Sequence, residues 1–151
     1  MNYRYGHTHL KAQDVEATKQ WYCSILDGKV TYEGMFRASK EYHLDIGGTC
    51  LAIHGELEDE LALPVSLHPR FGLDHFGLIV EDMDAAVAEL KAKGVHFVEG
   101  PWATGEGIRM ACIEAPDRVR IELVERGPLN TSDEPMRTDD GSQDLNRRNP
   151  R

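Results

Sequence analysis

The sequence contains no apolar run that approaches the roughly 20 residues needed to span a membrane as a helix. Its first residues, MNYRYGHTHLKAQD, lack the apolar core of a secretory signal peptide. There is no basic stripe either, and the net charge of −9 argues against nucleic acid as a partner, because phosphate contacts require clustered Lys and Arg. We therefore expect a protein that binds neither membrane nor nucleic acid.

Cysteines are few and have no metal-binding spacing. The three of them, Cys23, Cys50 and Cys112, are scattered without a CxxC pair. An odd count without a signal peptide favours a reducing compartment, so we predict a cytoplasmic protein. The remaining composition, 40% apolar and 28% charged over 151 residues, is typical of a soluble globular chain of about one domain.

An internal repeat organises the chain. The segment from His7 is HTHLKAQD and the segment from His75 is HFGLIVED, so each places a His seven residues before an Asp, with Leu at the fourth position. The offset between the two is 68 residues. Each segment is typical of a strand that leads into a helix, with Asp14 as the first helix cap and Asp82 or Asp84 as the second.

Three strand-like runs follow each predicted helix. They are residues 29–36, 41–46 and 49–54 in the first copy, and 95–99, 108–114 and 119–124 in the second. This pattern predicts an α+β fold with two tandem βαβββ modules in a single domain, residues 1–126: module one at 3–56, a linker at 57–72 and module two at 73–126. Residues 127–151 are polar and poor in large apolar residues, which predicts a disordered tail; a lid or an arm on a partner subunit is the alternative.

His7 and His75 are the first candidate metal ligands. They are repeat-equivalent and early in strands, and pseudo-symmetry brings such positions together where two copies meet. Two facing imidazoles gain nothing in packing, whereas a divalent metal needs converging N and O donors. In the last strand Ile121 and Leu123 alternate with Glu122, so Glu122 lies on the face opposite the helices, where a carboxylate is costly unless it is paired or binds a metal. A solvent-exposed Glu is the alternative.

A fourth ligand follows from the repeat offset. Subtracting 68 from 122 gives 54, and residue 54 is a His that shares the strand parity of Glu122. We therefore predict His54 as a ligand. Because the repeat has a gap at the helix, Ala52 is the alternative counterpart of Glu122. In that case Glu56 or water would complete the coordination shell of the metal. His9 shares the face of His7, and we predict that it supports a ligand or lines the pocket. The remaining histidines, His43, His68 and His96, are predicted to be surface or loop residues.

Together these residues resemble the vicinal-oxygen-chelate superfamily, which includes glyoxalases, extradiol dioxygenases and bleomycin resistance proteins. The resemblance covers about residues 3–126. Its marks are Gly6-His7 with Asp14, Trp21-Tyr22, Asp74-His75 with Asp82, and Ala115-Pro116-Asp117 ahead of Ile121-Glu122-Leu123. Two positions depart from it: Arg118 stands where the family usually has a Gly with positive φ, and His54 stands where the isomerases commonly have Glu or Gln.

The resemblance implies a cupped mixed β-sheet with the helices on its outer face and a metal inside. The family's first-strand ligands fall on His7 and His75, its last-strand glutamate on Glu122, and its fourth ligand near His54. The implied cofactor is one divalent metal ion, whether Fe, Ni, Co, Zn or Mn. The implied substrate is a small molecule that chelates the metal through two neighbouring oxygens, with Glu122 as the general base for proton transfer via an enediolate.

Three functions are consistent with these features. The first is a metal-dependent lyase or isomerase of the glyoxalase type; the others are an Fe(II)-dependent extradiol-type dioxygenase with a His-His-Glu triad and a metal-free binding protein of the bleomycin-resistance type. Arg37 and Arg109 are candidate anchors for a substrate carboxylate, with an ordinary ion pair as the alternative for each. Trp102 either walls the pocket or caps a sheet edge. We also expect a homodimer, because each module's sheet has edges that prefer cover.

Overall fold

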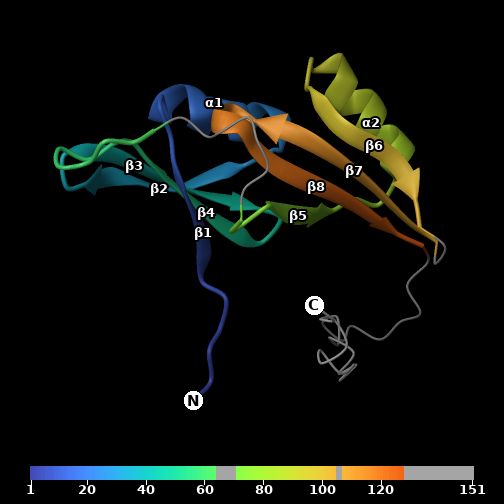
Figure 1. The fold of residues 1–151 in the computed structure, drawn as a ribbon, viewed down its shortest axis with the longest axis horizontal. Coiled ribbons are helices and arrows are strands. Elements are labelled where there is room, and N and C mark those ends of the chain that lie inside the picture. The colour runs from blue at the N-terminus through green and yellow to red at the C-terminus, as the bar shows by residue number, and fades with distance from the viewer. Residues whose placement is uncertain (64–70, 105–106, 128–151) are drawn as a thin grey trace, which may run out of the picture.

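The computed structural model of the protein describes residues 1–63, 71–104 and 107–127. The predicted tail lies outside these residues, apart from Gly127, as do His68 and residues 64–70 of the predicted linker. Within the described residues the elements follow the order strand, helix and three strands, twice over (Figure 1). None of the described helices is long and apolar enough to cross a membrane.

The element bounds agree with the predicted ones to within a few residues. The first module contains β1 (His7–Lys11), α1 (Val15–Ile25), β2 (Lys29–Phe36), β3 (Ser39–Ile46) and β4 (Thr49–His54). The second contains β5 (His75–Ile79), α2 (Met83–Ala92), β6 (Phe97–Ala103), β7 (Ile108–Ala115), the short 3-10 turn η1 (Pro116–Arg118) and β8 (Val119–Arg126).

The strands form two four-stranded mixed sheets with the same topology. Their orders are β1-β4-β3-β2 and β5-β8-β7-β6, and in each sheet the first pair is parallel and the others are antiparallel. This confirms the α+β class and the tandem βαβββ modules. Strands β1 and β5 each lie at a sheet edge, so the described strands form two separate sheets and not one continuous sheet.

Local side-chain chemistry begins each helix where the sequence predicted. Asp14 accepts a hydrogen bond from the backbone N of Ala17 at 2.9 Å, and Asp82 accepts one from Ala85 at 3.0 Å. Such caps satisfy backbone N–H groups that have no partner inside the helix. Of the two predicted caps for the second helix, the structure therefore uses Asp82.

Strand alternation places the core on the helix side of both sheets. On β4, Leu51 and Ile53 are buried, and on β8, Ile121 and Leu123 are buried. One cluster of buried side chains includes residues of both modules. The predicted parity of the last strand is confirmed, and Glu122 therefore lies on the face of its sheet that the helices leave uncovered.

Hydrogen bonds join the modules in addition to the shared core. Asp117 accepts hydrogen bonds from the backbone N of Gln13 at 3.2 Å and from its side-chain Nε2 at 2.8 Å. The Lys93 ammonium donates to the carbonyl of Ile25 at 3.1 Å. Asp117 and Arg118 both have positive φ, at 57° and 59°, so the position where the family usually has Gly does adopt the left-handed conformation.

Candidate functional site

The first module presents a cluster of imidazoles on the uncovered face of its sheet. His7 and His9 come from β1, and their ring centroids lie 5.6 Å apart. His54, at the end of β4, lies 4.7 Å from His9 between ring centroids. We call His7, His9 and His54 the first half-site. All three were predicted from the sequence as ligands or pocket residues.

His54 is held in one orientation by the backbone beside it. It is 8% exposed, and its Nδ1 lies 2.6 Å from the carbonyl oxygen of Gly55. A carbonyl oxygen only accepts, so Nδ1 carries the proton and the neutral ring has its free lone pair on Nε2. Metal-binding histidines show the same arrangement, in which the second ring nitrogen donates to a carbonyl or carboxylate.

The first half-site has an aromatic and an acidic neighbour that sequence reasoning missed. The Phe36 ring packs 5.2 Å from the ring of His54. Glu41 lies 3.3 Å from Nε2 of His43 and 3.9 Å from Nε2 of His9, measured to its Oε1. Burial, and then the charge of His54, lower the pKa of His9. His43, predicted as a surface residue, is half-buried on this face, whereas His96 is exposed as expected.

The second module brings His75 and Glu122 together on its uncovered face. His75 Nε2 lies 3.5 Å from Glu122 Oε2. On the other side of the ring, His75 Nδ1 lies 2.7 Å from Asp74 Oδ2. The hydrogen bond from His75 lowers the pKa of Asp74, which keeps that carboxyl ionised as an acceptor. In the neutral form of the ring Nδ1 therefore carries the proton, and Nε2, the nitrogen that faces Glu122, is free to bind a metal. We call His75 and Glu122 the second half-site.

Strand register corrects the equivalence that the repeat offset suggested. In the second module Gly77 pairs with Glu122, and in the first the equivalent residue, His9, pairs with Ala52. Ala52 is thus the structural counterpart of Glu122, and His54 is the counterpart of Val124. The constant offset of 68 fails because the second module is longer by two residues between its first and last strands. This overturns the counting argument for His54, while its role as a ligand stays a prediction.

The two half-sites do not meet within one chain. Among the described residues, which include every predicted ligand, no group of three or more His, Cys, Asp or Glu side chains lies close enough to hold a metal ion. Ligands of one divalent metal lie about 2.0–2.2 Å from it, and hence roughly 3–3.5 Å from one another. Only the pair His75 and Glu122 approaches that spacing among the predicted ligands.

Three further predicted residues lie in different surroundings. Arg109 makes two hydrogen bonds to Asp84 of α2, at 2.6 and 2.9 Å, on the helix side of the second sheet. That is the ion pair given as its alternative, and it places Arg109 on the face opposite Glu122. Arg37 follows β2, and its guanidinium lies 5.6 Å from the Phe36 ring centroid, beside the first half-site. Trp102 lies in β6, paired with Met110 of the neighbouring strand.

The sequence did not predict which side chains surround the second half-site. Arg120 pairs with His75 in the strand register and contacts Asp74 and Glu99. Cys112 pairs with Glu122, and burial raises the pKa of its thiol. The Asp74-His75 pair was visible in the sequence, but the position of Arg120 depended on strand register.

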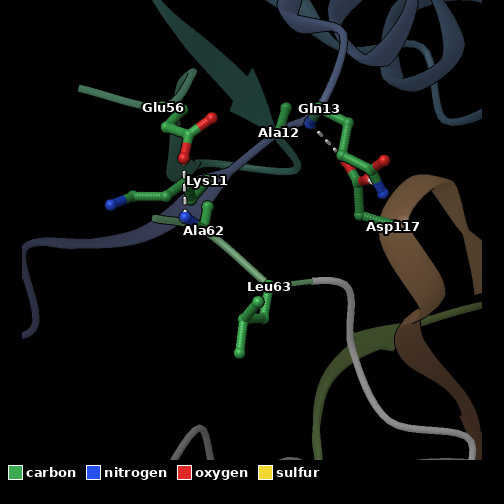
Figure 2. A pocket seen from close by; sticks show the side chains of 7 residues that line it. All are labelled: Lys11, Ala12, Gln13, Glu56, Ala62, Leu63 and Asp117. Carbon is green, nitrogen blue, oxygen red and sulfur yellow. Dashed lines mark hydrogen bonds between the residues drawn. The ribbon is translucent and has the colours of Figure 1, made fainter. Parts of the chain in front are cut away.

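A pocket of about 440 Å³ lies beyond the end of β1 (Figure 2). It is lined by Lys11, Ala12, Gln13, Glu56, Ala62, Leu63 and Asp117. Its polar groups are engaged with one another or with nearby backbone: Glu56 accepts a hydrogen bond from the backbone N of Ala62 at 2.7 Å, and Asp117 accepts two from Gln13. Of the predicted site residues only Glu56, the alternative ligand, lines this pocket, and its carboxylate is bound to the backbone of Ala62, so we do not assign the chemistry to it.

Comparisons with known proteins agree with this fold. A family model described as the Glyoxalase/Bleomycin resistance protein/Dioxygenase superfamily matches residues 4–123. A probable chloroplastic lactoylglutathione lyase of Arabidopsis thaliana is 44% identical over 59 residues, which are 38% of this chain and only 17% of that protein.

Solved structures match over nearly their whole length. A glyoxalase family protein from Enterococcus faecalis aligns with a TM-score of 0.68 and 24% identity, over 81% of this chain and 97% of that one. A mutant fosfomycin resistance protein from Listeria monocytogenes, solved with Mn(II) and 1S,2S-dihydroxypropylphosphonic acid, aligns with a TM-score of 0.67 and 21% identity, over 85% and 95% of the two chains. At these identities the likeness concerns the fold.

Proposed function

The chain belongs to the glyoxalase/bleomycin resistance protein/dioxygenase superfamily, and on that premise we propose that it is a metal-dependent lyase or isomerase of the glyoxalase type. Its substrate is a small molecule with two neighbouring oxygens. The observation that carries the proposal is the pair of donors His75 Nε2 and Glu122 Oε2, 3.5 Å apart, on the uncovered face of the second sheet.

The donor set suits a divalent metal. The spacing of His75 and Glu122 is close to that of two ligands of one ion. His75 and His54 each donate Nδ1–H to an oxygen acceptor, which leaves Nε2 as the metal-facing nitrogen in both. Imidazole and carboxylate donors together suit Fe, Ni, Co, Zn or Mn. The relative from Listeria monocytogenes was solved with Mn(II), which supports testing that ion first.

The site is completed, in this proposal, by a second copy of the chain. Among the described residues of one chain the half-sites do not combine into a group of three ligands, and hydrogen bonds of Asp117 and Lys93 join the modules. Strands β1 and β5, which carry His7 and His75, are both sheet edges, and Ile79 on β5 is 64% exposed. A two-fold dimer that placed the first half-site of one chain against the second half-site of its partner would cover both edges and form two identical sites.

Each residue then has a defined task. A bound divalent metal supplies a Lewis acid that polarises the oxygens of the substrate. Glu122, on a half-buried stretch of β8, accepts the proton from the carbon next to a substrate carbonyl. His9 and Phe36 wall the pocket on the side of the first half-site, and Arg37 lies close enough to Phe36 to meet an anionic group of the substrate there.

Metal content tests the proposal most directly. Wild-type protein purified without chelators should hold about one divalent metal ion per chain, since a two-fold dimer has two sites. His7→Ala, His75→Ala and Glu122→Ala should each lose most of it, as measured by elemental analysis of the folded protein. His96→Ala, an exposed histidine outside both half-sites, is the matched control. A wild-type protein without stoichiometric metal would leave the metal-free binding protein as the remaining function.

A mixing experiment tests the shared site. His7→Ala and Glu122→Ala are defective in different half-sites, so a mixed dimer has one site with both defects and one intact site. After unfolding and refolding the two variants together, random pairing should restore about a quarter of the wild-type metal content. If both half-sites belonged to one chain, mixing would restore none.

The register of the strands favours one second candidate, an Fe(II)-dependent extradiol-type dioxygenase. Because Ala52 is the counterpart of Glu122, the symmetric ligand set reduces to His7, His75 and Glu122, with a place left open for substrate or O₂. His54→Ala separates the two candidates: retained metal supports the triad, and lost metal supports the four-ligand site. His54→Gln, which keeps a side-chain N–H donor, checks that a loss does not come from misfolding. Assays with methylglyoxal–glutathione adduct and with a catechol follow from either result.

A further inference from the structure

The two repeat-equivalent histidines have different neighbours. His75 is preceded by Asp74, whereas His7 is preceded by Gly6. Across the strand pair, His75 lies opposite Arg120 and His7 lies opposite Cys50. The second module therefore has an acidic and a basic side chain at the positions where the first has neither.

These side chains form a continuous series of contacts that ends on His75. Glu99 Oε1 of β6 lies 3.1 Å from Arg120 Nη2. Arg120 Nη1 lies 3.9 Å from Asp74 Oδ1, and the other oxygen of Asp74 lies 2.7 Å from His75 Nδ1. The opposite nitrogen of the ring, Nε2, is the one that faces Glu122 at 3.5 Å. The series thus connects an edge strand to the metal-facing side of the imidazole.

We propose that Asp74 is a positioning residue that fixes the tautomer and ring orientation of His75, and that Arg120, held by Glu99, orients Asp74. It follows that the second half-site is preorganised to bind the metal, whereas His7 in the first half-site adjusts to a metal already held. The proposal rests on the metal-binding function proposed above, but it concerns a property of His75 that exists without metal.

Asp74 acts on His75 by deciding which ring nitrogen carries the proton. A neutral imidazole carries one N–H, and only the nitrogen without it can bind a metal. With a carboxylate 2.7 Å from Nδ1, the Nδ1–H form gains a hydrogen bond to a charged acceptor and Nε2 stays free. The ring also cannot flip without giving up that bond. His7 makes a T-shaped ring contact with His9 but has no such acceptor among the contacts found in the described residues.

The test measures the tautomer of His75 in metal-free protein by the ¹⁵N chemical shifts of its ring, at a pH where the ring is neutral. Wild type should show the Nδ1–H form. Asp74→Glu keeps an acceptor-only carboxylate and should retain that form, whereas Asp74→Ala should shift the ring toward the Nε2–H form. Arg120→Gln should give an intermediate mixture. Asp59→Ala, an exposed aspartate outside both half-sites, is the matched control.

Mn²⁺ affinity is the second readout. Asp74→Ala should weaken binding by about 10–100-fold, the usual effect of removing such a partner, and Asp74→Glu by less. Thermal unfolding of each variant confirms that the fold is retained. His75→Ala should lose more affinity than His7→Ala, because it removes the preorganised half of the site.

The proposal and the function on which it rests fail in different ways. If Asp74→Ala keeps the wild-type tautomer and the wild-type Mn²⁺ affinity, the positioning role is overturned and the metal-dependent function stands. If wild type binds no Mn²⁺ or other divalent ion, the proposed function is overturned, and the tautomer of His75 alone decides whether Asp74 positions the ring.

Discussion

At the scale of single residues, the fold buries the hydroxyl of Tyr22 at a cost. Tyr22 of α1 is fully buried, and its hydroxyl has no hydrogen-bond partner among the described residues. Burial, reinforced by the negative charge of Asp117, raises the pKa of that hydroxyl well above its ordinary range. An unsatisfied hydroxyl in a core is destabilising, so the favourable contribution of Tyr22 comes from its ring, which packs against Trp21 and the core cluster.

Replacing this hydroxyl should therefore stabilise the protein. Tyr22→Phe keeps the ring and removes the unpaired group, and we expect the free energy of unfolding to rise by about 1 kcal/mol. Urea unfolding measures the change. A loss of stability of that size would instead show that the hydroxyl makes a hydrogen bond, for example through water to Asp117. Tyr42→Phe, which removes a hydroxyl bound to Glu16 at 2.8 Å, is the control expected to destabilise.

At the scale of elements, α1 is tied to β3 by a network of charged side chains. Glu16 accepts hydrogen bonds from Lys19 and from the Tyr42 hydroxyl, and Lys40 donates to Tyr42 at 3.1 Å. The bond from Lys19, followed by that from Tyr42, lowers the pKa of Glu16 from 4.5 to about 2. The network thus stabilises the contact between helix and sheet only while Glu16 is ionised.

The free energy of unfolding should decrease as the pH falls, because the pKa of Glu16 is lowered in the folded protein. A carboxyl whose pKa is lower in the folded state stabilises above its unfolded value and loses that contribution as the pH falls through the folded value. For Glu16 the window runs from about 4.5 down to about 2. We expect the difference in urea midpoint between wild type and Glu16→Gln to be largest near neutral pH and to shrink across this window. Because the side chain is 45% exposed, the effect should be small and screened by salt.

Glu58→Gln provides the comparison for this pH series. Glu58 is exposed and lies outside the network of α1 and β3. The urea midpoint of the Glu58→Gln protein should follow that of wild type at every pH. A Glu16→Gln protein that tracks wild type in the same way would contradict the assignment of the low pKa to the bonds with Lys19 and Tyr42.

At the scale of the whole molecule, the two modules share one core. The cluster of buried side chains includes Tyr22 and Ile53 from the first module and Ile113 and Leu123 from the second. Hydrogen bonds from Gln13 to Asp117 join the modules as well. A core that crosses the boundary couples the unfolding of its two sides, because opening either one exposes apolar surface of the other.

The two tryptophans make this coupling measurable, since Trp21 lies in the first module and Trp102 in the second. Trp102→Phe leaves Trp21 as the reporter, and Trp21→Phe leaves Trp102. In each variant the fluorescence transition should have the same urea midpoint as circular dichroism of that protein. Ile53→Ala should cost about 2–5 kcal/mol and shift the Trp102 signal as much as the Trp21 signal. Separate midpoints within one variant would mean that the modules unfold independently.

Much of the fold was predictable from sequence because it depends on local patterns. The repeat, the caps at Asp14 and Asp82, and the alternation of Ile121, Glu122 and Leu123 fixed the element order and the face on which Glu122 lies. The His54 equivalence was wrong because it assumed a constant repeat length. The Arg109 ion pair with Asp84 was predictable only as an alternative, since the contact depends on where the first turn of α2 packs on the second sheet.

The sequence by itself thus determined two βαβββ modules and the side chains that each module presents on its uncovered face, because hydrophobic periodicity and capping act over a few residues. Only the tertiary structure decided that Ala52 stands opposite His9, that Arg120 and Asp74 meet beside His75, and that the two half-sites lie apart in one chain. Strand register joins residues far apart in sequence, and it is set by the packing of whole sheets and helices.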